Sequence, residues 1–138
     1  QKLKNMVSPF ILRRVKTDKS SIADLPDKLE TIDYTDLSAK QIVLYRKQVS
    51  ELEKAISEVE GMQRRGIVLS AITKLKQICN HPDQFLGQET YDPKESGKFA
   101  MLREICETIY EKRERVLEFT QYREITEPLA EFLEESVL

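Results

Sequence analysis

The stretch SAKQIVLYRKQVSELEKAISEV, residues 38–59, carries the strongest structural signal in the sequence. Ser38 and Gln41 stand three residues apart, which is the spacing of a capping box. In that motif the serine hydroxyl accepts a hydrogen bond from a backbone N–H at the helix start, and the glutamine side chain reaches back. Apolar residues then recur at steps of three and four, namely Ile42, Tyr45, Val49, Leu52, Ile56 and Val59. The pattern predicts a long helix with a narrow apolar seam.

A second helix is expected directly after this seam. Gly61 and Gly66 bracket the segment MQRR, which we expect to end the first helix and to turn the chain. The next helix carries a set of apolar side chains on one face, consisting of Val68, Ala71, Ile72, Leu75, Ile78 and Cys79. Two helices joined by a short turn form an antiparallel hairpin. Residues 38–80 are therefore predicted to be a helical hairpin.

The rest of the chain combines helical spacing with two strand-like segments. ETIDYTDLS (residues 30–38) alternates apolar with polar residues, and VLEFT (residues 116–120) is short and rich in β-branched or aromatic residues, so each predicts a short strand. Helical spacing returns in two apolar sets, one of Phe99, Leu102, Ile105, Cys106 and Ile109, the other of Ile125, Leu129, Phe132 and Leu133. Pro128 is tolerable only within the first helical turn. The predicted fold class is mainly α with a small β component.

Composition limits the classes of function. The chain has 138 residues, which suits one domain or a piece of a larger one. Its 22 basic and 24 acidic side chains give a formal charge of -2, so anion binding must be local. No apolar run approaches the roughly 20 residues of a membrane span, and two distant cysteines do not suggest a disulfide scaffold. We expect an intracellular protein, cytoplasmic or associated with the nucleoid, with no membrane partner.

The sole histidine lies in the segment LKQICNHPDQF, residues 75–85, which could be a site. Cys79 and His81 could supply two zinc ligands, but a structural site needs four, and only Cys106 remains. A Cys–His nucleophilic pair would lack an orienting third group. We interpret CNHP as a helix stop, with Asn80 in the left-handed conformation and Pro82 preventing continuation. No metal ligand and no catalytic residue is assigned.

Phosphate-binding signals are local. Gly61 and Gly66 have the separation of a Walker motif, but Ile67 and Val68 follow where Lys and Ser or Thr are required, so the chain has no P-loop. A basic cluster near the N-terminus consists of Arg13, Arg14, Lys16 and Lys19. This cluster is either a solvated surface, partly neutralised by Asp18, or a set of phosphate contacts, and its spacing leaves both alternatives open.

Six segments, taken in order, resemble the SWI/SNF-type family of helicase-like, DNA-translocating ATPases within superfamily two. They are SPFILRRVKTD, LPDKLE, LSAKQIVLY, LKQICNHP, SGKFAMLREI and RVLEFTQYREITEPLAEFL, and the last is most similar to bacterial members. The resemblance implies a motor of two RecA-like lobes with ATP between them and duplex DNA across both. Residues 1–30 would then be the end of the first lobe and the connector. Residues 31–138 would be an incomplete RecA-like α/β lobe that carries the hairpin 38–80.

The resemblance also implies where DNA is contacted. Thr120 and Gln121 lie in a Phe-Thr-Gln turn that is expected to face the DNA backbone, where a hydroxyl, an amide and free N–H groups can hold a phosphate oxygen. Ser96 and Lys98 are expected to form a second phosphate contact. Further contacts, to phosphate or between lobes, are expected from Arg13, Arg14 and Lys16.

The same resemblance implies what this fragment lacks. The P-loop lysine and magnesium-binding acids of the family lie upstream of Gln1, and the arginine finger lies downstream of Leu138. Because phosphoryl transfer needs all of these groups together, we expect no ATP hydrolysis and no bound cofactor in the fragment alone. ATP and Mg²⁺ are expected for the parent chain. Its partners would be duplex DNA and the remaining motor lobes in cis.

Glu118 departs from the family, which usually carries an apolar residue there. A carboxylate in a covered strand needs a partner, so we expect either an exposed strand edge or an ion pair with Lys112, Arg113 or Arg115. Strands missing from the fragment would leave an edge that favours self-association. The alternative function is a free-standing helical interaction module, in which the seam from Ile42 to Val59 pairs with a partner helix.

Overall fold

The computed structural model describes residues 6, 8–11 and 29–137. The chain divides into two compact units, residues 1–33 and 34–138. The described part of the first unit contains the short 3-10 helix η1 (Ser8–Phe10), and the side chain of Phe10 is exposed. The predicted contacts at Arg13, Arg14 and Lys16 lie outside the described residues.

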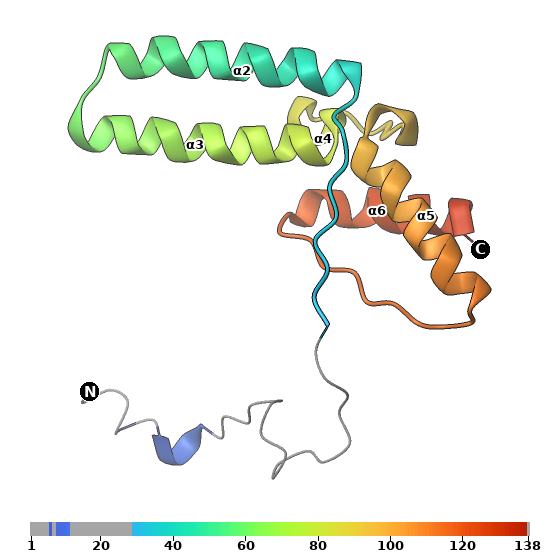
Figure 1. The fold of residues 1–138 in the computed structure, drawn as a ribbon. Coiled ribbons are helices and arrows are strands. Elements are labelled where there is room, and N and C mark those ends of the chain that lie inside the picture. The colour runs from blue at the N-terminus through green and yellow to red at the C-terminus, as the bar shows by residue number, and fades with distance from the viewer. Residues whose placement is uncertain (1–5, 7, 12–28, 138) are drawn as a thin grey trace. The chain divides into compact units, whose positions relative to one another are not determined.

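The second unit is built from helices joined by irregular segments (Figure 1). Its elements are α2 (Ala39–Ser57), α3 (Gly61–Asn80), α4 (Pro82–Leu86), η2 (Pro93–Glu95), α5 (Gly97–Glu111), η3 (Arg123–Ile125) and α6 (Thr126–Val137). No strand occurs within the described ranges. The mainly α class is therefore confirmed, while neither predicted strand forms. None of the described helices has the length and apolar character needed to cross a membrane.

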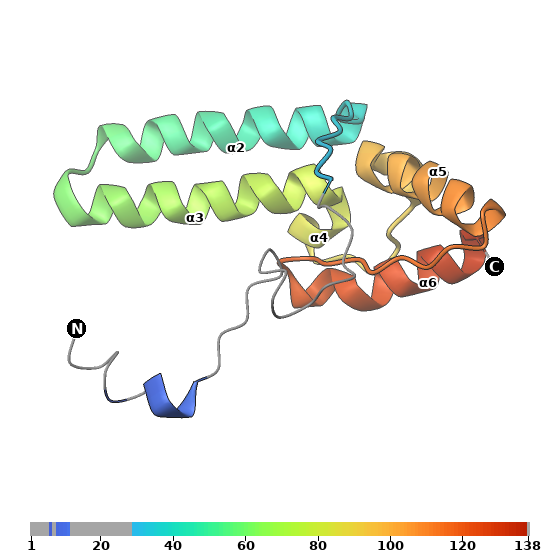
Figure 2. The ribbon, with the colours of Figure 1, turned by 60° about the horizontal axis from the view of Figure 1, so that its bottom comes forward.

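The predicted helical hairpin is formed by α2 and α3, which lie side by side in both Figure 1 and Figure 2. The capping box is complete, since the Ser38 hydroxyl accepts from the Gln41 N–H at 3.2 Å and the Gln41 Oε1 accepts from the Ser38 N–H at 2.9 Å. Ala71 and Ile78 of α3 are buried, and the seam residues Leu52 and Ile56 of α2 are half-buried. The seam thus serves as the packing face of the hairpin.

The hairpin turn lies earlier than predicted. The helix α2 ends at Ser57, and Gly61 is already the first residue of α3, with a left-handed φ of 64° that reverses the chain. Gly66 lies inside α3, although it was expected at the turn. A helical glycine costs only about 1 kcal/mol relative to alanine, so one glycine does not end a helix whose neighbours pack well.

The core of the second unit lies between α5 and α6. Phe99, Ile125, Leu129 and Phe132 form a buried cluster, and the Phe99 and Phe132 ring centroids are 4.8 Å apart. These residues belong to the two apolar sets predicted from helical spacing. Pro128 is the third residue of α6 and so falls in the first turn, as predicted.

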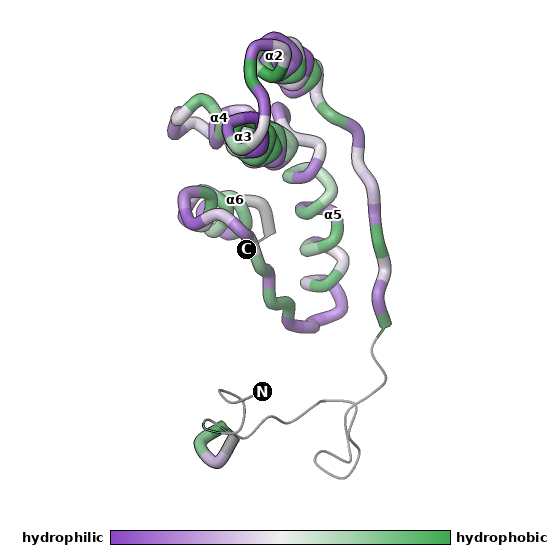
Figure 3. Tube along the Cα trace, turned by 90° about the vertical axis from the view of Figure 1, so that its left-hand side faces the viewer, coloured by the Kyte–Doolittle hydropathy of each residue, from purple (hydrophilic) through white to green (hydrophobic). Residues whose placement is uncertain are grey.

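Both predicted strands are extended segments without a strand partner. Figure 3 shows apolar and polar residues alternating along the segment that leads into α2. A β-strand needs a neighbouring backbone for its hydrogen-bond ladder, and no described segment supplies one. In residues 116–120, Leu117 and Phe119 are 83% and 87% exposed. Their pattern matched a strand, but the pairing that makes a strand is absent from the described residues.

Candidate nucleic-acid interface

The candidate site is built around the end of α3 and the start of α2, the part of the molecule that we call the base of the hairpin. The helix α3 ends at Asn80, and His81 is extended, with φ of -155° and ψ of 140°. The His81 N–H still donates to the Gln77 carbonyl at 3.0 Å, while its ring caps α4, which begins at Pro82. The predicted stop is confirmed, but Asn80 is not left-handed. An extended His81 that ends one helix and starts the next makes a left-handed residue unnecessary.

His81 is fully buried and both ring nitrogens are engaged. Nδ1 accepts from the Asp83 N–H at 3.1 Å, and Nε2 lies 2.9 Å from the Asp92 carbonyl oxygen, which can only accept. This pattern requires a neutral ring with the proton on Nε2. The ring packs against Tyr91 and Phe99, with centroids 4.9 and 5.1 Å away. His81 is thus a structural residue with no free lone pair.

An ion-pair network fixes α2 to the same base. The Lys40 ammonium donates to the Asp83 carboxylate at 3.2 Å and to the Glu95 carboxylate at 2.5 Å. The hydrogen bond to Glu95, reinforced by that to Asp83, raises the pKa of Lys40. Asp83 is buried and also accepts from the Tyr91 N–H at 3.0 Å. The network joins the start of α2 to α4 and η2.

Ser96, predicted as a phosphate contact, is the N-cap of α5. Its buried hydroxyl accepts from the Phe99 N–H at 3.3 Å and donates to the Asn80 carbonyl at 2.6 Å. Because both functions of the hydroxyl are used inside the chain, it is not free for a ligand here. Its effect is positional, since it holds the start of α5 against the end of α3. Lys98 then reaches Asn80, with Nζ 2.9 Å from Oδ1.

Gly97 makes this junction sterically possible. A Cβ at this position would clash with the backbone oxygen of Asp36 and would come within 2.7 Å of the Thr35 hydroxyl. The extended backbone before α2 therefore passes directly over the start of α5. Only a residue without a side chain allows that approach.

The turn that contains Thr120 and Gln121 is exposed and tied to α3. The Thr120 hydroxyl accepts from the Tyr122 N–H at 3.3 Å, and the Gln121 Oε1 accepts from the Lys76 ammonium at 3.4 Å. Just beyond the turn, Glu124 accepts from the side-chain amides of Gln84 and Gln77, both at 3.0 Å. The Gln84 bond, followed by a backbone hydrogen bond and the Gln77 bond, lowers the pKa of Glu124.

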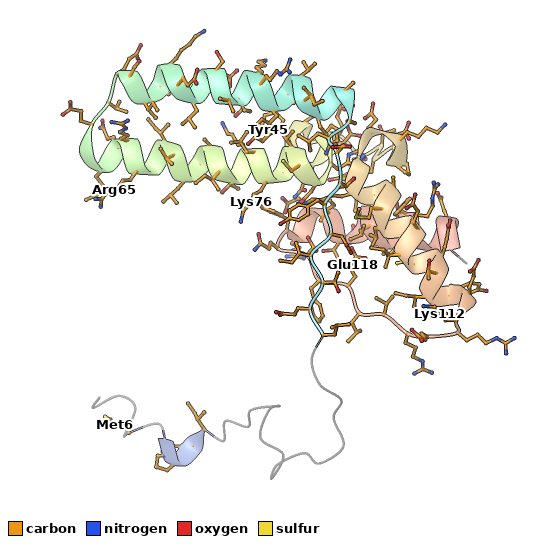
Figure 4. All side chains as sticks on the ribbon, in the orientation of Figure 1. Met6, Tyr45, Arg65, Lys76, Lys112 and Glu118 are labelled. Carbon is orange, nitrogen blue, oxygen red and sulfur yellow. The ribbon has the colours of Figure 1, made fainter. Side chains whose placement is uncertain are left out.

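A cavity of about 510 Å³ lies where these elements meet. Its polar lining consists of Lys76, Asn80, Lys98, Thr120 and Gln121, and Tyr45, Ile72 and Phe119 are among the apolar lining residues. In Figure 4, Tyr45 and Lys76 mark the side of the cavity formed by the hairpin. The cavity thus brings together Lys98, Thr120 and Gln121, three of the predicted site residues.

Lys76 is a site residue that the sequence analysis missed. It lies one helical turn before Asn80, on the side of α3 that borders the cavity. Its i, i+4 relation to Asn80, within the LKQICNHP segment, was the only available signal, and it is weak without a structure. Within the described ranges, neither Lys76 nor Lys98 forms an ion pair with a carboxylate. In this part of the chain no carboxylate lies within ion-pair distance of either ammonium group.

Glu118 lines a smaller adjacent cavity of about 190 Å³, whose lining includes the apolar Phe99, Leu102, Ile125 and Leu129 and the polar Asn80, Lys98 and Thr120. These apolar surroundings desolvate the carboxyl and raise its pKa, although much of the residue is exposed. The predicted ion pair is wrong, because in the described part of the chain Glu118 pairs with none of Lys112, Arg113 and Arg115. The alternative expectation, an exposed strand edge, is also not met, because residue 118 lies in an exposed segment that forms no strand. Figure 4 shows Glu118 and Lys112 well apart.

Comparison with known proteins gives one family model and several relatives. The model described as "SNF2-related domain" matches residues 1–84. The chain is 35% identical over 136 residues to the "Putative ATP-dependent helicase/translocase YwqA" of Bacillus subtilis, covering 97% of this chain and 15% of that protein. It is 32% identical over 138 residues to "DNA repair and recombination protein RAD26" of Saccharomyces cerevisiae, covering 95% and 12%. The chain therefore spans about one seventh of these relatives or less.

Two solved structures from Sulfolobus solfataricus are similar to the chain. The SWI2/SNF2 ATPase core in complex with dsDNA has 39% sequence identity and a TM-score of 0.75, covering 97% of this chain and 28% of that one. The C-terminal domain of the SWI2/SNF2 ATPase has 33% identity and a TM-score of 0.75, covering 79% and 47%. The similarity thus extends to the three-dimensional arrangement.

Proposed function

Because the chain belongs to the SNF2-related family of SWI2/SNF2-type ATPases, we propose that it forms the inter-lobe connection and the first part of the second lobe of an ATP-driven translocase on duplex DNA. Its own contribution in this proposal is to bind the DNA backbone. The chain covers only a small share of its relatives, so the motor activity is proposed for a longer protein. The similar core structure from Sulfolobus solfataricus is described as a complex with dsDNA, which supports DNA as the partner.

The observation that carries the proposal is the cavity where Lys76, Lys98, Thr120 and Gln121 meet. Two ammonium groups, one hydroxyl and one amide suit phosphate oxygens, and such contacts position a protein on DNA without reading sequence. Lys98 is the second residue of α5, where the helix dipole adds partial positive charge. Ser96 would support the site by holding α5 in place. The net charge of the chain is -2, so this local concentration of positive charge has to supply the attraction.

We further propose that this chain hydrolyses no ATP by itself. Transfer of a phosphoryl group needs a phosphate cradle, a metal and a charge-stabilising arginine together. The glycine pair with Walker-like spacing is no cradle, because Gly61 starts α3 and Gly66 lies within it. The remaining motor lobes in cis would bind ATP and Mg²⁺ and would complete the site. A cytoplasmic or nucleoid location would follow from work on duplex DNA.

The test is a titration of a fluorescein-labelled DNA duplex with the chain, followed by fluorescence anisotropy. Lys98→Glu is compared with Lys94→Glu, which makes the same charge change on an exposed residue outside the cavity. We expect Lys98→Glu to weaken binding clearly more than Lys94→Glu. It should also reduce the slope of log K against log salt by about one, the change expected for one lost phosphate contact. Equal losses in the two variants would contradict the proposal.

ATP turnover is measured separately, with the chain alone and with the longer protein, each with and without duplex DNA. We expect turnover only for the longer protein, and stimulation by DNA. Turnover by the purified chain would refute the claim that it lacks an ATP site. Absence of turnover in the longer protein would leave DNA binding as the function of the cavity, without a motor.

The alternative function, a free-standing interaction module, would need the α2 seam to be available to a partner. The seam instead packs against α3, and Leu52, Ala55, Ile67 and Ala71 line a common cavity between the two helices. The double variant Leu52→Lys with Ile56→Lys separates the two uses. We expect loss of folding by circular dichroism, whereas a folded variant that loses a partner would favour the module.

A further inference from the structure

The helix α3 has a second apolar stripe, on the side away from α2. Starting at Met62, steps of three and four residues lead through Arg65, Leu69 and Ile72 to Lys76, and we name these five residues the outer stripe. Met62, Leu69 and Ile72 are 86%, 66% and 44% exposed. The buried side chains of α3, Ala71 and Ile78, lie on the opposite face. Met62, Arg65 and Leu69 line neither of the cavities that α2 and α3 share, whereas Ile72 and Lys76, at the other end of the stripe, border the cavity that Tyr45 of α2 also lines.

All the charged side chains of α3 are positive. Its 20 residues include Arg64, Arg65, Lys74 and Lys76 and no acidic residue, although the whole chain has an excess of acids. Figure 4 shows Arg65 and Lys76 on the same side of α3, near its two ends. In the described part of the chain neither side chain forms an ion pair. The exposed apolar residues are thus placed between two positive charges.

The stripe has the dimensions of a helix-binding surface. From Met62 to Lys76 it runs about 21 Å, at 1.5 Å per residue, which is the length of about four helical turns. Apolar positions at three- and four-residue spacing are what an opposing amphipathic helix needs for its own stripe. Exposed apolar residues grouped in this way, in place of scattered single ones, mark an interaction surface.

We propose that the outer stripe of α3 docks an amphipathic helix with acidic flanks, carried by a protein partner. Its apolar side chains would cover Met62, Leu69 and Ile72. Its carboxylates would meet Arg65 and, when no DNA is bound, Lys76, which also lines the cavity proposed to bind DNA. Duplex DNA is the less suitable occupant, because phosphates gain nothing from three exposed apolar side chains. A surface that mixes apolar contacts with one sign of charge selects for the opposite charge in its partner.

The probe is a synthetic helical peptide of about four turns, with leucines at three- and four-residue spacing and glutamates on both flanks. Control peptides have the same composition in scrambled order, or lysine in place of every glutamate. Binding to the chain is followed by anisotropy of a label on the peptide. The test variants are the pair Met62→Gln with Leu69→Gln, and Arg65→Glu, none of which lines the DNA-binding cavity. The matched controls are Val43→Gln and Arg46→Glu, on exposed positions of α2.

Of the three peptides, we expect only the acidic one with ordered leucines to bind. The double variant Met62→Gln with Leu69→Gln should weaken its binding at least about tenfold, as expected for the loss of two apolar contacts. Arg65→Glu should weaken it as well, and both controls should bind as the unaltered chain does. Thermal unfolding confirms that each variant is folded. No binding, equal binding of the lysine peptide, or equal loss in the controls would overturn the proposal.

Two further outcomes would also overturn it. If Arg65→Glu lowered affinity for duplex DNA as much as Lys98→Glu, the stripe would belong to the DNA interface. If sedimentation showed a dimer that Leu69→Gln dissociates, the occupant would be a second copy of this chain. The two surfaces share Ile72 and Lys76, but Lys98 lies outside the outer stripe, and Met62, Arg65 and Leu69 lie outside the cavity. The two proposals are therefore tested at different residues, and their failures can be told apart.

Discussion

The side-chain amide of Gln41 donates to the carbonyl oxygen of Ile78 at 2.8 Å, and so joins the first turn of α2 to the last turn of α3. Both side chains are fully buried. The same amide also lies 3.2 Å from the Cys79 carbonyl, while the Gln41 Oε1 accepts from the Ser38 N–H. One side chain therefore caps a helix and closes the hairpin.

We expect Gln41→Ala to lower the free energy of unfolding by about 2–3 kcal/mol. The substitution leaves the partly buried Ser38 N–H and two helix-terminal carbonyls without their partner, and buried unsatisfied groups cost about 1–3 kcal/mol each before water compensates. The measurement is urea unfolding. Ser50→Ala, on the exposed side of α2, is the control and should stay within about 0.5 kcal/mol. Similar values for the two variants would show that the hairpin closure contributes little.

Two glycine substitutions are expected to act in opposite directions. Gly97→Ala should destabilise by about 1–3 kcal/mol, because its Cβ meets the backbone of Asp36 and the extended segment must move. Gly66→Ala should stabilise by up to about 1 kcal/mol, since the site lies inside α3 with no atom within 4 Å of the new Cβ. Thermal unfolding of both variants is the measurement. A stable Gly97→Ala would mean that the segment before α2 does not pass as closely as described.

Metal removal is expected to leave the stability unchanged. His81 uses both ring nitrogens within the chain, and the described residues contain no group of three ligands that could hold a metal ion. Addition of a chelator, or of zinc, should therefore not shift the thermal midpoint. Elemental analysis of the purified chain should find no stoichiometric metal. A chelator-dependent midpoint would require a ligand set other than His81.

Glu124 is expected to contribute stability that is lost in acid. Its pKa is lowered in the folded chain, so folding favours the charged form and the contribution is present above the ordinary value of 4.5. It disappears as the pH falls through the folded pKa. Glu124→Gln keeps acceptors for Gln84 and Gln77 but cannot titrate. The unaltered chain should therefore lose more stability than the variant below about pH 4.5, as followed by urea unfolding across pH. Parallel pH profiles would contradict this.

Glu118 is expected to act in the opposite sense. Its pKa is raised by desolvation, so folding favours the protonated carboxyl and the charge opposes folding at neutral pH. Glu118→Gln should therefore stabilise the chain at pH 7, and the gain should vanish as the pH falls below about 4.5, the ordinary pKa. The gain should be small because the residue is largely exposed. Glu114→Gln, an exposed neighbour, serves as the control. A gain that persists in acid would point to packing instead of charge.

Local patterns predicted much of the fold. The capping box at Ser38, the hairpin and the apolar sets that built the core around Phe99 and Phe132 were readable from spacing alone. Each of these depends on residues within one or two helical turns. The strands were predicted wrongly because VLEFT carries the pattern of a strand, whereas pairing depends on a second segment that the pattern does not contain.

The candidate site was predicted only in part, because its assembly is not local. Lys98, Thr120 and Gln121 were named in advance, but Lys76 enters the cavity from a helix more than forty residues away from the turn. The buried polar contacts at the base of the hairpin were also missed. Asp83, Gln84 and Ser96 are polar residues in loop-like sequence, and only the fold shows that they are buried and fully bonded.

The closure between Gln41 and Ile78 has a mechanical consequence. It fixes one end of two antiparallel helices that lie side by side, and α2 alone, with 19 residues, is about 28 Å long. The hairpin is therefore held at one end, which we call its root, and this end adjoins Lys76 and the turn at Thr120. A tilt of about 10° at the root would displace the tip near Gly61 by about 5 Å, which follows from that length. Small movements of the elements around the cavity of Lys76 and Lys98 would therefore be magnified into a displacement of several ångströms at the far end of the hairpin.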